Sequence, residues 1–140
     1  MPEARRRALL VEDEPADQTL IVSAFERIGS QITIDVVATV AEAQQALQAE
    51  TLPVLCLVDL RLRGESGLDL IAWARRDERA RLTPFVVLSG SDDRTVVRQA
   101  YDAGANAYLV KPQNLADIDE LARRIDAFWL GACALADDPR

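Results

Sequence analysis

The side chains best suited to chemistry in this 140-residue sequence directly follow short apolar runs. Glu12 and Asp13 follow the first run, Asp59 the third, Ser89 the fourth and Lys111 the fifth. Three carboxylates brought to one place would repel one another, so such a set requires a cation. The sequence contains no histidine, and oxygen ligands without histidine or cysteine favour Mg²⁺ over zinc or copper.

Together these residue types fit the transfer of a phosphoryl group. Asp59 is a carboxylate that can act as a nucleophile and form an aspartyl phosphate. The Lys111 ammonium can pair with one phosphoryl oxygen, and the Ser89 hydroxyl can donate a hydrogen bond to another. Metal and lysine would stabilise charge on the transferring group. Singly, each residue has an ordinary explanation as a turn, loop or helix-start residue, so the prediction depends on their lying together.

The elements that must position these residues alternate between strand and helix patterns. Strand-like runs cover residues 8–11, 32–37, 55–58, 85–88 and 107–110. Helical patterns begin at Pro15, at the capping-box pair Thr39 and Glu42, after Gly67, at Ser91 or Asp92, and at Asn114. Apolar strands separated by helices predict an α/β fold with a doubly wound five-stranded parallel sheet and five helices. Ligands of such folds bind beyond the carboxyl ends of the strands, where all four polar segments fall.

Length and charge narrow the class of protein. The length fits one domain, predicted over residues 8–130, with an arm at 1–7 and a tail at 131–140. The net charge of −7 disfavours nonspecific nucleic-acid binding. No apolar stretch has the length of a membrane span, and the start of the sequence lacks the pattern of a signal peptide. A cytoplasmic protein that binds neither nucleic acid nor membrane is therefore expected.

Four motifs resemble the receiver domains of two-component response regulators. They are LLVEDEPAD at 9–17, LVDLRLRGESGLDLI at 57–71, VVLSG at 86–90 and AGANAYLVKP at 103–112. The likeness spans roughly residues 8 to 130 and implies a flavodoxin-like sheet with strand order 2-1-3-4-5. It further implies a switch rather than an enzyme, one that accepts a phosphoryl group from a histidine kinase.

The resemblance assigns roles to individual residues. Glu12 and Asp13 would hold Mg²⁺ with Asp59, the phosphoacceptor, and Arg61 would add its backbone carbonyl to the metal. Lys111 would be the invariant lysine of the family.

Two further roles concern the conformational response. Ser89 would fill the hydroxyl position that engages the phosphoryl group, and Tyr108 matches the aromatic residue that then moves inward. The resemblance also implies a cis peptide bond between Lys111 and Pro112. The sequence departs from the family pattern at Arg63, where a proline is usual. Arg61 has a long charged side chain and stands at a position where, in the family, the side chain affects how the phosphoryl group is lost.

The C-terminal segment NLADIDELARRIDAFWLGACAL is similar to the end of phytochrome-associated single-domain response regulators. This shorter match implies a bacterial phytochrome histidine kinase as the phosphoryl donor. The residues after 130 are too few for a DNA-binding or catalytic output domain, so a single-domain response regulator is expected.

The last helix indicates self-association. One stripe is predicted to face the sheet, and further apolar residues widen it beyond what the sheet needs. The stripe is Leu115, Ile118, Ala122, Ile125 and Trp129, and the additions are Leu121, Phe128 and Leu130. These additional apolar residues predict a homodimer through the face formed by the fourth helix, fifth strand and fifth helix together with the C-terminal extension. The alternative is that the last helix has a broad buried face.

Two other functions fit the same fold. A receiver that is never phosphorylated could serve as an adaptor, although the acidic residues and Lys111 argue against this. A flavodoxin-like electron carrier would need a loop rich in serine, threonine and glycine after the first strand. Glu12, Asp13 and Glu14 would instead repel a flavin phosphate.

Overall fold

The computed structural model describes residues 6–136 and 138–139. Five parallel strands form one sheet in the order β2-β1-β3-β6-β7, which is the predicted order once the two strands of a small hairpin are left out of the numbering. The strands are β1 (Arg7–Val11), β2 (Thr33–Val37), β3 (Leu55–Val58), β6 (Phe85–Ser89) and β7 (Ala107–Val110). The helices are α1 (Pro15–Arg27), α2 (Val40–Leu47), α3 (Gly67–Arg76), α4 (Arg94–Ala103) and α5 (Leu115–Ala127), with short turns η1 (Ala80–Leu82) and η2 (Phe128–Ala132).

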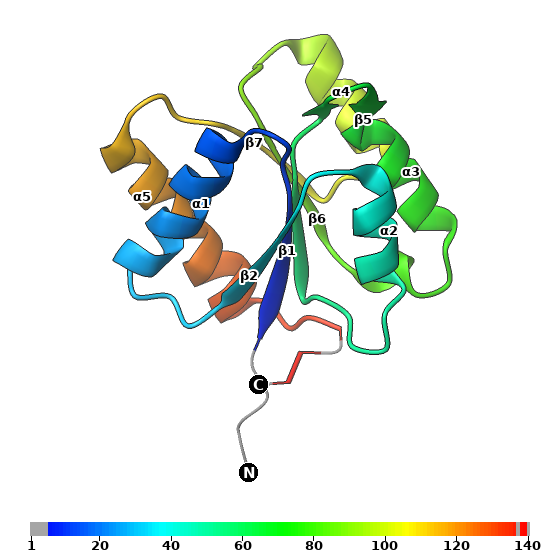
Figure 1. Cartoon of the computed structure of the whole chain (residues 1–140), viewed down its shortest axis with the longest axis horizontal. Helices are drawn as coiled ribbons and strands as arrows, with labels where there is room; N and C mark the ends of the chain where they lie inside the picture. Colours follow the sequence, from blue (N-terminus) through cyan, green and yellow to red (C-terminus); the bar gives the residue numbers. More distant parts are fainter. Residues whose placement is uncertain (1–5, 137, 140) are drawn as a thin grey trace.

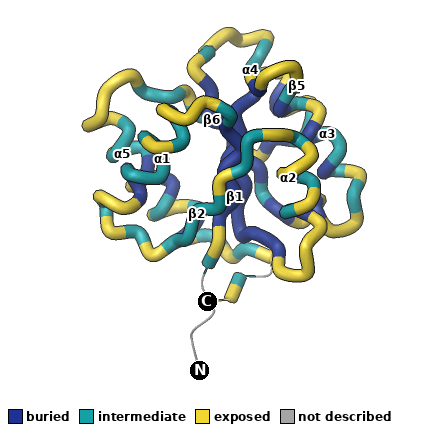
Figure 2. The backbone as a smooth tube through the Cα atoms, viewed as in Figure 1, coloured by how far each residue is buried: buried dark blue, intermediate teal, exposed yellow. Residues whose placement is uncertain are grey.

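Helices cover both faces of the sheet (Figure 1). Helices α1 and α5 pack on one face, and α2, α3 and α4 pack on the other. Every residue of β3 and β6 is buried, as Figure 2 shows for the centre of the molecule. This explains why these strands read as continuous apolar runs rather than as alternating ones. The doubly wound α/β prediction is confirmed.

The capping signals mark most helix starts correctly. The Thr39 hydroxyl accepts the Glu42 amide at 3.1 Å, and Asn114 caps α5 by accepting the Asp117 amide at 2.9 Å. Gly104 ends α4 with a φ of 115°, a left-handed conformation that favours glycine. The prediction for α4 was wrong by one or two residues, because Asp93 rather than Ser91 or Asp92 accepts the amides of its first turn.

The predicted face of the last helix needs correction. Leu115 was assigned to the buried stripe but is 57% exposed, while Leu130 was assigned to the excess but is 3% exposed. The reason for the burial of Leu130 lies in η2, which is a π-helical turn. A π turn holds more residues than an α turn, so it rotates the following side chains. Leu130 is thereby brought onto the core and Phe128 is left 57% exposed.

The structure describes part of the predicted arm at 1–7 and of the predicted tail at 131–140. Strand β1 begins at Arg7, one residue inside the predicted arm. Residues 1–5 of the arm and 137 and 140 of the tail lie outside the described residues. Arg6 forms an ion pair with Asp138 at 2.8 Å, which holds part of the tail against the start of β1. Within the described ranges, no helix is both long and apolar enough to span a membrane.

A small antiparallel hairpin after Asp59 was not predicted. Strands β4 (Arg61–Leu62) and β5 (Glu65–Ser66) pair across a tight turn in which Gly64 has a φ of 68°. The Ser66 hydroxyl then caps α3 by accepting the Leu68 amide at 3.1 Å. The hairpin thus connects the end of β3 directly to the start of α3.

Candidate functional site

Backbone pairing brings the ends of four strands to one rim of the sheet. The Glu12 amide donates to the Val37 carbonyl at 3.0 Å, and the Asp59 amide donates to the Val11 carbonyl at 2.9 Å. The amide of Lys111 donates to the Ser89 carbonyl at 2.8 Å. These contacts extend the sheet by one residue beyond β1, β3 and β7. Together with the pairing of β3 and β6, they place Glu12, Asp59, Ser89 and Lys111 at one rim of the sheet.

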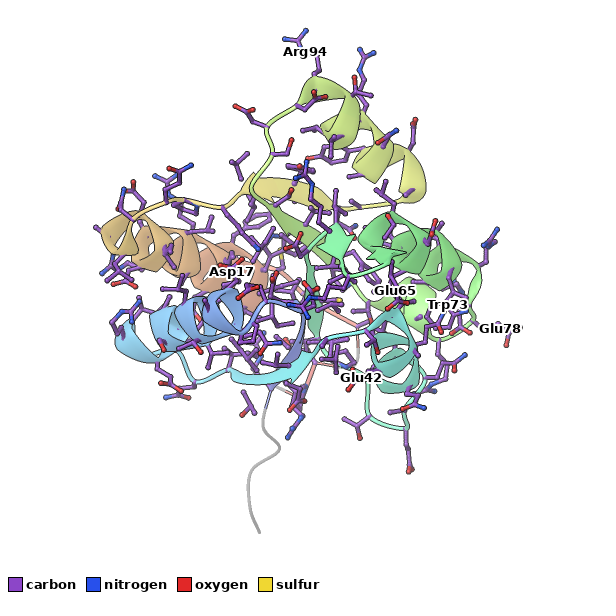
Figure 3. All side chains as sticks on the ribbon, turned by 45° about the horizontal axis from the view of Figure 1, so that its top comes forward. Asp17, Glu42, Glu65, Trp73, Glu78 and Arg94 are labelled. Atoms are coloured by element: carbon purple, nitrogen blue, oxygen red, sulfur yellow. The ribbon has the colours of Figure 1, made fainter. Side chains whose placement is uncertain are left out.

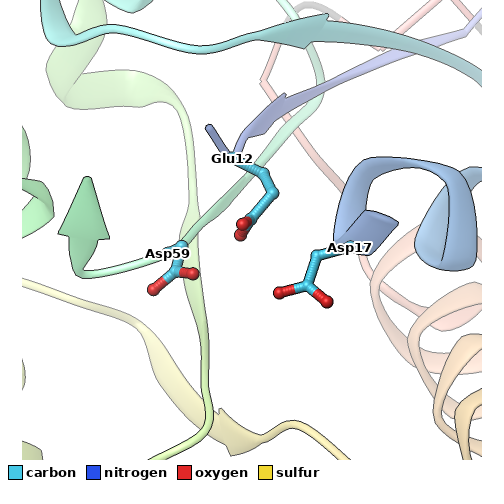
Figure 4. Close-up of side chains that lie close together, drawn as sticks. All are labelled: Glu12, Asp17 and Asp59. Atoms are coloured by element: carbon cyan, nitrogen blue, oxygen red, sulfur yellow. The ribbon is translucent and has the colours of Figure 1, made fainter. Parts of the chain in front are cut away.

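The Lys111 ammonium joins three carboxylates at this rim. Its Nζ lies 2.8 Å from Asp59 Oδ2, 2.9 Å from Glu12 Oε2 and 3.1 Å from Asp17 Oδ2. Oxygens of the three carboxylates lie within 4.8 Å of one another, and Figure 4 shows the side chains converging. When all three are ionised, three negative charges against one positive charge leave −2. This excess charge, carried by oxygen ligands, fits a divalent cation such as Mg²⁺.

Burial affects the ionisation of Glu12 and Asp59, the two carboxylates nearest to the Lys111 ammonium. Loss of water around Glu12, whose side chain is 1% exposed, raises the pKa of that carboxyl to about 7, and the neighbouring Asp59 adds to the rise. Burial also opposes ionisation of Asp59. Hydrogen bonds from Glu12, Lys111 and the Arg61 amide outweigh this effect, so the pKa of Asp59 lies below its ordinary value. Asp59 is therefore the member of the pair that ionises more readily.

An open cleft of about 340 Å³ lies above Asp59. Its lining residues are Asp17, Asp59, Arg61, Ser89, Gly90, Ser91 and Lys111. The Ser89 hydroxyl, although buried, lines this cleft and accepts the Ser91 amide at 3.3 Å. Asp59 and Lys111 therefore both line a cleft that is open to solvent.

Asp13 is not brought into the acidic cluster. Its Oδ2 instead accepts the Arg63 amide at 2.9 Å and lies 3.8 Å from the Arg63 guanidinium. The usual family residue at position 63, proline, has no amide hydrogen to donate. The departure noted in the sequence therefore gives Asp13 a partner on the β4–β5 hairpin. Metal binding by Asp13 stays a prediction and would require this carboxylate to turn.

Asp17 is the site residue that sequence reasoning missed. It stands in the first turn of α1, and its position at the rim is visible in Figure 3, away from peripheral charges such as Glu78 and Arg94. The signal that could have found it was its spacing. A helix that begins at Pro15, directly after the acidic end of β1, places its first turn at the same edge of the sheet.

Arg61 and Tyr108, the remaining predicted residues, each form a hydrogen bond at or near the rim that involves one backbone group. The Arg61 amide donates to Asp59 Oδ1 at 3.0 Å, while ligation of metal by its carbonyl stays a prediction. Tyr108 is partly buried, and its hydroxyl donates to the Ser91 carbonyl at 2.6 Å, two residues beyond Ser89. The expected cis bond before Pro112 is absent, since the described residues contain no cis peptide. An X–Pro bond favours trans by only about 0.5–1 kcal/mol, and nothing but the resemblance indicated cis.

The sequence model of the family described as "Response regulator receiver domain" matches residues 8–123. This chain belongs to that family. Two relatives are similar over most of their length. A probable methanogenesis regulatory protein, FilR2 of Methanothrix harundinacea, is 36% identical over 88% of this chain and 83% of its own. The response regulator Rcp1 of Synechocystis is 32% identical over 91% of this chain and 90% of its own.

Solved structures of receiver proteins share the fold. The phosphorylated cyanobacterial phytochrome response regulator RcpA superposes with a TM-score of 0.87 at 29% identity, covering 95% of this chain and 99% of that one. The response regulator RPA3017, in red light signalling of R. palustris, gives 0.87 at 27% identity, covering 93% and 97%. The receiver is thus homologous to single-domain response regulators of two-component signalling, in which phosphorylation by a kinase is the family role.

Proposed function

We propose that this receiver accepts a phosphoryl group from a histidine kinase on Asp59 and works as a cytoplasmic single-domain switch. The main support is the position of an ionised carboxylate at the floor of an open cleft, 2.8 Å from a lysine ammonium. A carboxylate in this setting is a nucleophile that is reachable from outside. An adaptor that is never phosphorylated would have no use for this arrangement.

The chemistry follows from the groups that face the cleft. An Asp59 oxygen attacks the phosphorus of a phosphohistidine, a P–O bond forms, and the P–N bond breaks with its electron pair left on the imidazole nitrogen. Lys111 donates to an oxygen of the transferring group, and the Arg61 amide holds the other Asp59 oxygen at 3.0 Å. This chain contributes mainly orientation and charge stabilisation, which phosphoryl transfer chiefly requires.

A divalent metal fits beside Asp59. Glu12 and Asp59 supply oxygen ligands, with Asp13 and the Arg61 carbonyl as the further ligands the resemblance implies. Mg²⁺, when bound, would neutralise charge on the transferring oxygens. The response regulator Rcp1 has been solved in a Mn²⁺-bound form, which supports a divalent metal in this family.

The response to phosphorylation would travel along the loop after β6. We infer that a phosphoryl group on Asp59 draws the Ser89 hydroxyl toward it. Ser91, whose amide contacts Ser89 and whose carbonyl accepts the Tyr108 hydroxyl, would shift with it. Tyr108 would then alter the surface of α4, β7 and α5. The added group biases this loop only through its different affinity for the two positions.

Removal of the nucleophile tests the proposal. Incubation with a small phosphodonor and Mg²⁺ is expected to add one phosphoryl group to the wild type and none to Asp59→Asn, because an amide oxygen is a poor nucleophile. The change is read as intact mass. Loss of labelling when the metal is removed by a chelator is expected as well. Equal labelling of both proteins would refute Asp59 as the acceptor.

A phytochrome-type kinase is the proposed donor. The similarity to the phytochrome response regulator RcpA and to RPA3017 of red light signalling supports it, together with the C-terminal FWL sequence. Phosphotransfer should be compared across the histidine kinases of the source organism, including a red-light sensor. The red-light sensor is expected to be the fastest donor, and faster transfer from another kinase would contradict the assignment.

We further propose a homodimer through α4, β7 and α5. Tyr101, Val110 and Leu115 are 50%, 45% and 57% exposed on this face, and the Tyr101 hydroxyl accepts the Tyr108 amide of the edge strand β7. Burial of these side chains against a second copy would remove apolar surface from water. Sedimentation of the protein treated with beryllium fluoride should show a dimer for the wild type and a monomer for Leu115→Glu. A wild-type monomer with and without the mimic would contradict this proposal.

A further inference from the structure

Asp17 differs from the other two partners of Lys111. Glu12 and Asp59 come from strand ends and are 1% and 12% exposed, whereas the Asp17 side chain comes from helix α1 and is 37% exposed. In the part of the chain that the structure describes, the Asp17 carboxylate has one charged partner, the Lys111 ammonium. It therefore sits at the outer edge of the cluster with no other ion pair to satisfy.

The lysine has no donor left for a fourth acceptor. An ammonium carries three N–H donors, and those of Lys111 reach Asp59, Glu12 and Asp17 at 2.8, 2.9 and 3.1 Å. To contact a phosphoryl oxygen, Lys111 must give up one of these partners. A metal bound by Glu12 and Asp59 would weaken their hold on the lysine. The contact with Asp17 would remain if the metal takes the ligands that the resemblance implies, which do not include Asp17, whose carboxylate lies within 4.8 Å of the other two.

From its position, Asp17 can weaken the binding of a phosphoryl group in two ways. It lines the phosphoryl cleft together with Ser89 and Ser91, and it also lines an apolar groove between α1 and α5. It therefore holds the lysine on the α1 side of the cleft. Its own negative charge, moreover, faces the space that an anionic phosphoryl group would fill.

We propose that Asp17 is a positioning residue that restrains Lys111 and thereby weakens the phosphoryl-bound state relative to the metal-bound unphosphorylated state. This inference depends on the proposed function and adds a regulatory residue to it. When Asp17 loses its charge, Lys111 is released toward the phosphoryl group. In the absence of that group, the released lysine pairs more strongly with Glu12 and Asp59 and competes with the metal.

Asp17→Asn separates this role from a structural one, because it is expected to change two affinities in opposite directions. Calorimetric titration should show weaker Mg²⁺ binding. Titration with beryllium fluoride, an anionic phosphoryl mimic, at saturating Mg²⁺ should show tighter binding. Each change is expected to be about threefold to tenfold, the range for removing one partly screened charge nearby.

Two variants serve as controls. Asp17→Glu keeps a carboxylate and should lie closer to the wild type than Asp17→Asn in both titrations. Glu26→Gln removes the same charge from the exposed far end of α1 and should leave both affinities at the wild-type values. A lower melting temperature of Asp17→Asn with both affinities unchanged would show that Asp17 only favours the helix N-terminus, and would overturn the inference.

The outcomes also separate this inference from the proposed function. Failure of the wild type to bind both Mg²⁺ and the mimic would refute the proposed function and this inference together. Wild-type binding that is lost in Asp59→Asn, combined with unchanged affinities in Asp17→Asn, would refute the role of Asp17 alone. Changes of Asp17→Asn in the same direction for metal and mimic would also contradict it.

Discussion

Gly67→Ala is expected to destabilise the protein by about 3 kcal/mol, the upper part of the usual range for overpacking. A Cβ at position 67 would collide with the backbone carbonyl oxygen of Asp59 and lie 3.0 Å from the Leu60 Cα. Both are main-chain atoms, so neither can move aside by a side-chain rotation. The Gly67 amide also donates to the Leu60 carbonyl at 3.0 Å, which fixes this close approach.

Denaturant unfolding measures the loss, and Gly90→Ala is the matched control. A Cβ at Gly90 would meet no atom within 4 Å, so its free energy of unfolding should stay near that of the wild type. Because the collision involves Asp59 itself, Gly67→Ala should also phosphorylate more slowly at temperatures where it remains folded. Wild-type stability of Gly67→Ala would contradict the close packing of Asp59 and Leu60 against the start of α3.

Lys111→Met is expected to cost about 3 kcal/mol of stability without metal, as when one partner of a buried ion pair is removed. The substitution keeps an unbranched apolar chain but leaves three carboxylates without their shared cation. Burial opposes ionisation of the Lys111 ammonium, but contacts with Asp59 and Glu12 outweigh this and raise its pKa above the ordinary value. The charge is thus present at neutral pH and is lost in the variant.

Metal should reverse much of that loss. Mg²⁺ offers positive charge to the same carboxylates, so it should stabilise Lys111→Met more than the wild type in denaturant unfolding. Arg123→Met is the control, because Arg123 pairs with the exposed Glu120 and an exposed pair contributes less than about 1 kcal/mol. Metal-free Lys111→Met as stable as the wild type would show that the cluster does not depend on the lysine.

The alternation of strands and helices and the rim of the site were predictable from sequence because each depends on local patterns, whereas the strand order followed from the family resemblance. Buried strands read as apolar runs, and the residue after each run marks a carboxyl end of the sheet. Asp59, Ser89 and Lys111 needed nothing else to be placed together. Pro15 and Asn114 likewise marked the starts of α1 and α5 correctly.

Features that depend on turns or on tertiary partners were not predictable in this way. The π-helical turn at Phe128–Ala132 changes the phase of the last residues, so a constant helical period misplaced Leu130. The hairpin after Asp59 supplies the Arg63 amide that holds Asp13, and no apolar run signals two strands of two residues each. Asp17 lies in the first turn of a helix, so a pattern that marks only the residues after apolar strands does not point to it.

The phosphoryl group is expected to reside on the carboxylate of Asp59, and its position can be determined directly. Borohydride reduces an aspartyl phosphate to homoserine, and peptide mapping locates that residue. After phosphorylation in Mg²⁺, homoserine should appear at position 59 and at no other acidic position of the rim. Reduction at position 12, 13 or 17, or stable phosphate on a serine with no reduced aspartate, would contradict the account.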